Sequence, residues 1–158
     1  MYYVIIRGPA GAGKTAIAKA LAKRLDAKYI SFDNVLKKHG LDTIKGSCIT
    51  AKNFIKANKI ALISVSKKPV VFDGCFYHKS QLNHLIKELP ENPIVFTLKA
   101  SIDDCIKNDE KRKSIGEKAI IAVHKLVSKF SYGHVIETNN KTEKQLVVEM
   151  FKAIKRGS

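Results

Sequence analysis

The stretch YYVIIRGPAGAGKTAIAKALAKRL, residues 2–25, decides the fold. It begins with a short apolar, β-rich run at 2–6 and ends in a segment from Thr15 onward whose apolar residues recur at helical spacing. Between the two lies GPAGAGKT, residues 8–15, which matches the pattern G-x-x-x-x-G-K-[ST]. A strand, a glycine loop and a helix in this order are the context that a phosphate-binding P-loop requires.

The chemistry of this loop depends on its glycines and on the two residues that end the motif. Glycine lets the loop curl so that backbone N–H groups and the start of the helix point at phosphate oxygens. Lys14 is expected to reach the β- and γ-phosphates, and Thr15 to ligate Mg²⁺. The expected nucleotide-binding residues are Gly8, Pro9, Ala10, Gly11, Ala12, Gly13, Lys14, Thr15 and Ala16. A glycine-rich turn with a chance Lys-Thr pair is the alternative, and the flanking strand and helix argue against it.

The rest of the chain alternates between strand and helix patterns. Further strands are predicted at 28–31, 69–73, 93–100 and 133–137. Helices are predicted at 32–40, within a basic region up to about 68, and at 79–89, 101–112, 117–130 and 141–156. Such alternation predicts an α/β fold with a parallel sheet and helices on both faces. We expect one domain over residues 1–158.

Composition excludes several classes of protein. With 158 residues, 45% of them apolar, the chain is long enough to close a single core. No apolar run approaches the roughly 18 residues that a membrane span needs, so we expect a cytoplasmic protein without a membrane segment. Three cysteines without C-x-x-C spacing are expected to be small buried thiols rather than redox or metal groups.

The charge is strongly positive, with 29 basic and 14 acidic residues and a formal net charge of +15. Only four of the basic residues are arginines, and a lysine excess is weaker evidence for nucleic-acid binding than arginine would be. Within 37–68 eight lysines face a single acid, Asp42. This segment either attracts an acceptor that already bears phosphates or is a lysine-rich exposed helix face. It offers only Phe54 as a platform for stacking bases, with Phe32 just before it.

The run VVFDG, residues 70–74, carries the second candidate for metal binding. Asp73 ends an apolar strand, where P-loop proteins place an acid that orients Mg²⁺; a cap on a helix or turn is the alternative. Position 74 is Gly, so no carboxylate follows Asp73 to activate water. LKAS at 98–101 replaces the Asn-Lys-x-Asp signature of guanine-specific GTPases. These features favour transfer to an acceptor over hydrolysis.

These motifs resemble the small P-loop kinases of the nucleoside-monophosphate-kinase type, and within them the polynucleotide-kinase-like and zeta-toxin-like group. The resemblance lies in IIRGPAGAGKTAIAKAL at 5–21, SFDNV at 31–35, VVFDG at 70–74 and LKASIDDCIKNDEKR at 98–112. It implies a three-layer P-loop NTPase fold, whose five-stranded parallel sheet has the order 2-3-1-4-5. It also implies ATP and Mg²⁺ as cofactors, an acceptor-binding region at about 33–68 and a lid at about 107–117.

The resemblance also implies roles for individual residues. Asp33 matches the acid that contacts the acceptor hydroxyl and acts as general base, and an N-cap for the following helix is its alternative. Arg112 matches a lid cation that stabilises the transferring phosphoryl group; the alternative is a solvated helix end. The first lid arginine is missing, because Asn108 stands in its place. Asn139, in TNNKT at 138–142, is a candidate for adenine contacts.

The sequence therefore predicts a Mg-ATP-dependent kinase that transfers the γ-phosphoryl group to a hydroxyl of a nucleic-acid 5′ end or a nucleotide-like acceptor. Lys14, Asp33 and Arg112 are the expected catalytic residues, and Thr15 and Asp73 the expected metal-binding residues. The alternatives are a kinase of a small metabolite and a nucleotide-dependent RNA-binding or ATPase protein with little transfer activity. The expected partners are ATP and an RNA or DNA 5′ end or a phosphorylated small molecule, bound by a monomer or homodimer.

Overall fold

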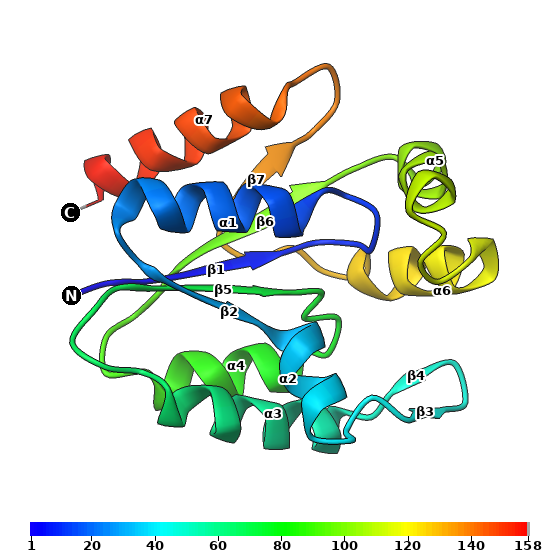
Figure 1. Ribbon diagram of the computed structural model, residues 1–158, viewed down its shortest axis with the longest axis horizontal. Helices are drawn as coiled ribbons and strands as arrows, with labels where there is room; N and C mark the ends of the chain where they lie inside the picture. The colour runs from blue at the N-terminus through cyan, green and yellow to red at the C-terminus, as the bar shows by residue number, and fades with distance from the viewer. Residues whose placement is uncertain (158) are drawn as a thin grey trace.

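A five-stranded parallel sheet forms the centre of the molecule in the computed structural model, which describes residues 1–157 (Figure 1). Its strands are β1 (Tyr3–Arg7), β2 (Lys28–Ser31), β5 (Val70–Gly74), β6 (Ile94–Lys99) and β7 (His134–Glu137). They lie in the order β2-β5-β1-β6-β7, and each neighbouring pair is parallel. Counted without two short hairpin strands, this is the expected order 2-3-1-4-5.

Helices cover both faces of this sheet, which confirms the three-layer α/β fold (Figure 1). They are α1 (Lys14–Leu25), α2 (Phe32–Lys38), α3 (Ala51–Ile63), α4 (Lys79–Glu88), α5 (Ile102–Arg112), α6 (Glu117–Val127) and α7 (Glu143–Arg156). In Figure 1, α1 and α7 lie on one face and α2, α3 and α4 on the other. No helix within residues 1–157 is long and apolar enough to cross a membrane.

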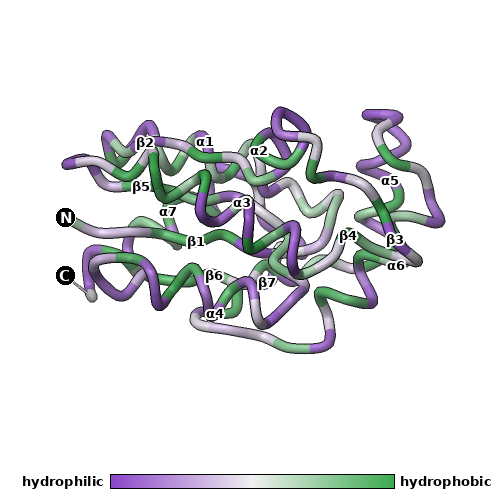
Figure 2. The backbone as a smooth tube through the Cα atoms, turned by 90° about the horizontal axis from the view of Figure 1, so that it is seen from below, coloured by the Kyte–Doolittle hydropathy of each residue, from purple (hydrophilic) through white to green (hydrophobic). Residues whose placement is uncertain are grey.

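The central strand shows why a continuous apolar run forms here. All five residues of β1 are buried, because successive side chains point to opposite faces and both faces are covered. Val4 and Ile6 join the core under α1 and α7, whereas Tyr3 and Ile5 join the core under α2, α3 and α4. Figure 2 shows the hydrophobic colour along this strand. The strand thereby fixes the position of the glycine loop that follows it.

The region between α2 and α3 differs from the prediction. Instead of helix from 32 to 40 and onward, α2 ends at Lys38 and an antiparallel hairpin follows, with β3 (Ile44–Lys45) and β4 (Cys48–Ile49). Gly46 turns the hairpin with a φ of 72°. Thr50 then caps α3 by accepting a hydrogen bond from the backbone N–H of Asn53.

Two side chains from the segment between β5 and α4 form hydrogen bonds with this hairpin. The hydroxyl of Tyr77 accepts a hydrogen bond from the Ile49 N–H at 3.0 Å, and Nε2 of His78 donates to the Ile49 carbonyl at 2.7 Å. The hairpin therefore has a defined place beside the carboxyl ends of the strands, where open α/β sheets bind ligands.

The three cysteines are free thiols. Cys105 is buried, as expected, and burial raises its pKa to about 11, so its thiol stays neutral. Cys48 and Cys75 are only half-buried, which corrects the expectation for these two.

Arg7, at the end of β1, is fully buried and has no carboxylate partner among residues 1–157. Burial lowers its pKa to about 10. Its guanidinium donates to the carbonyls of Val127 at 3.1 Å, Phe130 at 3.0 Å and Phe76 at 3.4 Å, and to Oγ1 of Thr97 at 3.3 Å. It also stacks on the Phe130 ring at 4.2 Å. Arg7 therefore ties the end of α6 and the segment after β5 to the strand that leads into the P-loop.

Arg7→Met is expected to lower the free energy of unfolding by about 3 kcal/mol, because it leaves buried carbonyls without donors. Urea denaturation measures this change. The matched control is Arg24→Met, since Arg24 is exposed on α1 and stacks on Phe151 at 4.3 Å. Equal losses in the two variants would show that the buried hydrogen bonds of Arg7 add nothing to stability.

Candidate active site

The glycine loop adopts the conformation that its motif predicts. Gly11 and Gly13 have φ angles of 85° and 84°, in the left-handed region that favours glycine. A side chain at Gly11 would also place its Cβ 2.5 Å from the carbonyl oxygen of Cys105, at the start of the lid region. Gly13 is the N-cap of α1, so the first turn of this helix presents its N–H groups at the loop.

Lys14 begins α1 and its side chain is buried. Its ammonium group donates to the Pro9 carbonyl at 2.9 Å, within the loop itself. Burial works to lower the pKa of Lys14, but neighbouring groups, among them Cys75, Asp73 and Asp33, outweigh it and raise that pKa. Lys14 therefore stays charged where phosphate is expected.

Asp73 lies at the carboxyl end of β5 and is buried. Its Oδ2 accepts a hydrogen bond from the hydroxyl of Tyr29 at 2.6 Å. The helix that follows, α4, has His78 as its N-cap, so the alternative role of Asp73 as a cap of this helix is wrong. Its charge acts on Lys14, which places the carboxylate near the P-loop as predicted.

The donors fit Mg²⁺ that arrives with a nucleotide. Residues 1–157 contain no cluster of three His, Cys, Asp or Glu side chains able to hold a metal ion alone. The hydroxyl of Thr15 and the carboxylate of Asp73 are hard oxygen donors. Mg²⁺ commonly takes one or two such protein ligands and fills its other positions with phosphate oxygens and water. The donor set therefore suits a Mg-nucleotide rather than a permanent metal.

Asp33 lies in the first turn of α2 and is exposed. The N-cap of this helix is Ser31, whose hydroxyl accepts from the Asn34 N–H at 3.2 Å, so the capping alternative for Asp33 is wrong. The charge of Asp33 acts on Lys14 and on Tyr77, beside the hairpin. The structure therefore brings Asp33, Lys14 and Asp73 to one side of the P-loop.

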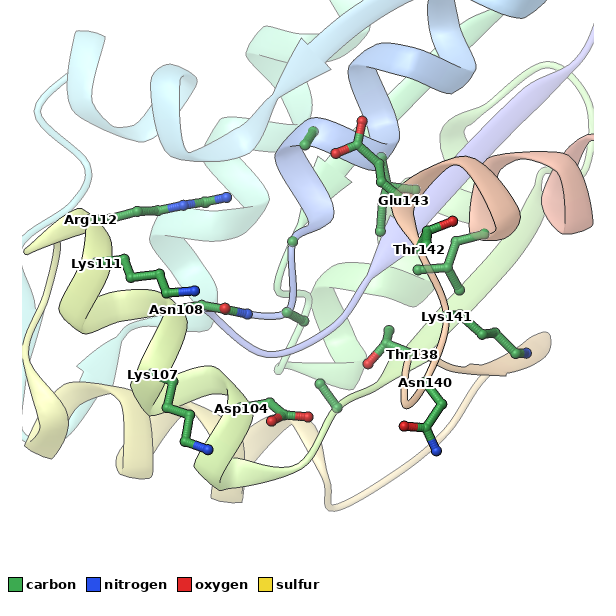
Figure 3. Close-up of a pocket in the computed structure, with 16 residues that line it drawn as sticks. Asp104, Lys107, Asn108, Lys111, Arg112, Thr138, Asn140, Lys141, Thr142 and Glu143 are labelled. Carbon is green, nitrogen blue, oxygen red and sulfur yellow. The ribbon is translucent and has the colours of Figure 1, made fainter.

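A cavity of about 580 Å³ lies between the start of α1, the helix α5 and the loop after β7 (Figure 3). Three predicted nucleotide-binding residues, Ala12, Gly13 and Ala16, form part of its wall. Asn139 lies outside this wall in an exposed turn, whereas its neighbour Asn140 lines the cavity. Thr138, Lys141 and Thr142 of the same TNNKT segment also line the cavity, and the adenine contact stays a prediction.

The predicted lid segment, 107–117, is hydrogen-bonded to the P-loop. Nδ2 of Asn108, which stands where the first lid arginine was expected, donates to the Gly11 carbonyl at 2.7 Å. The buried carboxylate of Asp109 accepts from the backbone N–H groups of Ile115 at 3.0 Å and Gly116 at 2.9 Å. Both ends of the segment are therefore held by side chains of α5.

Arg112 lies in the last turn of α5 and is exposed. It also lines the cavity, and in Figure 3 its side chain extends, with that of Lys111, into the space between α5 and the start of α1. Arg112 is therefore both a solvated residue at a helix end and a cation beside the cavity. Its catalytic role stays a prediction.

Sequence reasoning missed Tyr29, and it missed Asn108 as a P-loop contact. Neither residue had a usable signal, because their partners lie 44 and 97 residues away in the chain.

The fold and the P-loop define a class: the chain has the three-layer α/β fold of the small P-loop kinases, with the P-loop after the central strand. The Shikimate kinase family profile matches residues 10–155. The chain therefore belongs to the shikimate kinase family. The polynucleotide-kinase-like and zeta-toxin-like group, expected from the sequence, is not the family that matches.

Individual relatives are similar over the fold or over a part of it. A cytidylate kinase of Saccharolobus islandicus is 42% identical over 55 residues, which cover 32% of this chain and only 29% of that protein. A shikimate kinase from Acinetobacter baumannii in complex with shikimate aligns with a TM-score of 0.73 at 18% identity, over 100% of this chain and 95% of its own. A gluconokinase from Sinorhizobium meliloti 1021 aligns with a TM-score of 0.73 at 12% identity, over 98% and 92%. These two structures show a shared fold.

Proposed function

We propose that this protein transfers the γ-phosphoryl group of ATP to a hydroxyl of a small metabolite. The observation that carries this proposal is the place of Asp33. Among residues 1–157 its carboxylate caps no helix and forms no ion pair, and its charge acts on Lys14 of the P-loop. A carboxylate so placed is suited to accept the proton of an acceptor hydroxyl as the new O–P bond forms.

The other residues have complementary roles in this proposal. Lys14 and the loop amides hold the β- and γ-phosphates, while Arg112 stabilises negative charge on the transferring group. Thr15 and Asp73 would hold Mg²⁺, which would offset negative charge on the phosphates. Gly74 leaves the position after Asp73 without a carboxylate for water, which favours transfer over hydrolysis.

The family match and the named relatives support a small acceptor. Shikimate, gluconate and cytidine monophosphate are the acceptors that the names of these relatives indicate, and each carries a negative charge. The lysines of segment 37–68 are exposed, which agrees with attraction of an anionic acceptor. For a nucleic-acid 5′ end as the acceptor, this positive charge is the sole support.

The test is transfer of labelled γ-phosphate from ATP to shikimate, gluconate, cytidine monophosphate and a 5′-hydroxyl oligonucleotide, each in parallel with a reaction without acceptor. We expect a labelled small molecule, an unlabelled oligonucleotide and little free phosphate. A labelled oligonucleotide would support the polynucleotide kinase hypothesis instead. Phosphate release that no acceptor increases would identify an ATPase.

A further inference from the structure

Tyr29 forms a hydrogen bond with Asp73, a predicted metal-binding residue on a different strand. It lies on β2, which pairs with β5 in a register that sets Tyr29 opposite Val71 and Ser31 opposite Asp73. Residues two apart on a strand share a face, so the Tyr29 side chain lies on the same face as Asp73. Its hydroxyl donates to Oδ2 of Asp73 at 2.6 Å, a length typical of an O–H donor and an ionised carboxylate.

The hydroxyl of Tyr29 is the donor in this hydrogen bond, because a carboxylate oxygen only accepts. The two residues are 44 positions apart in the chain, and the parallel pairing of β2 with β5 brings them together.

We propose that Tyr29 is a positioning residue for the Mg²⁺ site. Its hydroxyl donates to Oδ2 of Asp73 and thereby fixes the orientation of the carboxylate that would hold the ion or its water. Partners that hydrogen-bond to metal-binding carboxylates orient them, and their loss typically costs about 10- to 100-fold in metal affinity or activity. This inference rests on the proposed function only in that a Mg-nucleotide binds at this P-loop.

A purely structural role for Tyr29 predicts something different. The half-buried ring packs against the core under α1 and α7, and the ammonium group of Lys19 lies 5.7 Å from its centre. Tyr29→Phe keeps this ring and removes only the hydroxyl. If Tyr29→Phe changes only metal binding, the hydroxyl acts by positioning Asp73 and not by packing in the core.

The experiment is calorimetric titration of the full chain with ADP, with and without Mg²⁺. For Tyr29→Phe we expect the affinity for Mg²⁺ in the ADP complex to fall about 10-fold, with ADP affinity in the absence of Mg²⁺ and the melting temperature unchanged. The matched control is Tyr132→Phe. Tyr132 is 36% exposed and directly precedes β7, which is the edge strand on the opposite side of the sheet from β2. The control variant is expected to bind Mg²⁺ and ADP as the wild type does.

A double-mutant cycle with Asp73→Asn keeps the inference testable even if Tyr29→Phe loses stability. Because the phenol acts through Asp73, its removal is expected to add little to the loss of Mg²⁺ affinity already caused by Asp73→Asn. Additive losses, or unchanged Mg²⁺ affinity in Tyr29→Phe, would overturn the positioning role while leaving the proposed transfer reaction intact. If the wild-type chain bound no Mg-ADP, both proposals would be wrong.

Discussion

Lys14→Ala is expected to lower kcat/KM for phosphoryl transfer by about 1,000-fold or more. Its ammonium group donates to the Pro9 carbonyl inside the glycine loop, and neighbouring groups raise the pKa of Lys14 despite its burial. A fixed charge in a buried site acts on the phosphates more strongly than one in water, because little solvent screens it. The measurement is steady-state transfer of labelled γ-phosphate from ATP to whichever of the tested acceptors is phosphorylated.

The control for this variant removes a charge from the same helix without touching the loop. Lys23 lies in the last turn of α1 and is exposed, so Lys23→Ala is expected to keep kcat/KM within about twofold. Both variants are compared by melting temperature, because Lys14 also forms an internal hydrogen bond to Pro9. Transfer by a folded Lys14→Ala variant at more than about a tenth of the wild-type rate would contradict the assigned role.

The fold was predictable wherever burial is complete on both sides of a strand. β1 and β5 are buried at every residue, so their apolar runs have no other plausible environment. The strand order came from the resemblance to P-loop kinases. The hairpin β3–β4 was not predictable, because each strand has two residues and Ile44 is 62% exposed. Contacts with Tyr77 and His78, distant in the sequence, determine its place.

In the candidate site too, residues fixed by a local pattern were predictable and residues fixed by distant contacts were not. Lys14, Thr15 and Asp73 were predictable, because a local backbone pattern or a strand end fixes each of them. Tyr29 joins the site through a hydrogen bond to a residue 44 positions away. Asn108 does so through one that spans 97 positions. No periodicity or motif within a single segment contains such pairs, so only the assembled fold shows them.

Asp33→Asn is expected to lower kcat for transfer by about 100- to 10,000-fold, the range that a general base contributes. The amide keeps the size of the side chain but cannot take the proton of the acceptor hydroxyl. Helix α2 is expected to be unaffected, because Ser31 rather than Asp33 caps it. The loss is therefore expected in kcat, with a smaller change in the KM for ATP, since Asp33 does not line the cavity between α1, α5 and the loop after β7.

Asp42→Asn provides the control for charge, since it also removes one exposed negative charge from the basic acceptor-side segment. If Asp33 acted only through the electrostatic potential near this segment, both substitutions would change the KM for the acceptor similarly and leave kcat unchanged. A base role predicts instead that only Asp33→Asn lowers kcat. Transfer at the wild-type rate by Asp33→Asn would show that the acceptor hydroxyl loses its proton without this carboxylate, which would leave Asp33 at most a group that orients the acceptor.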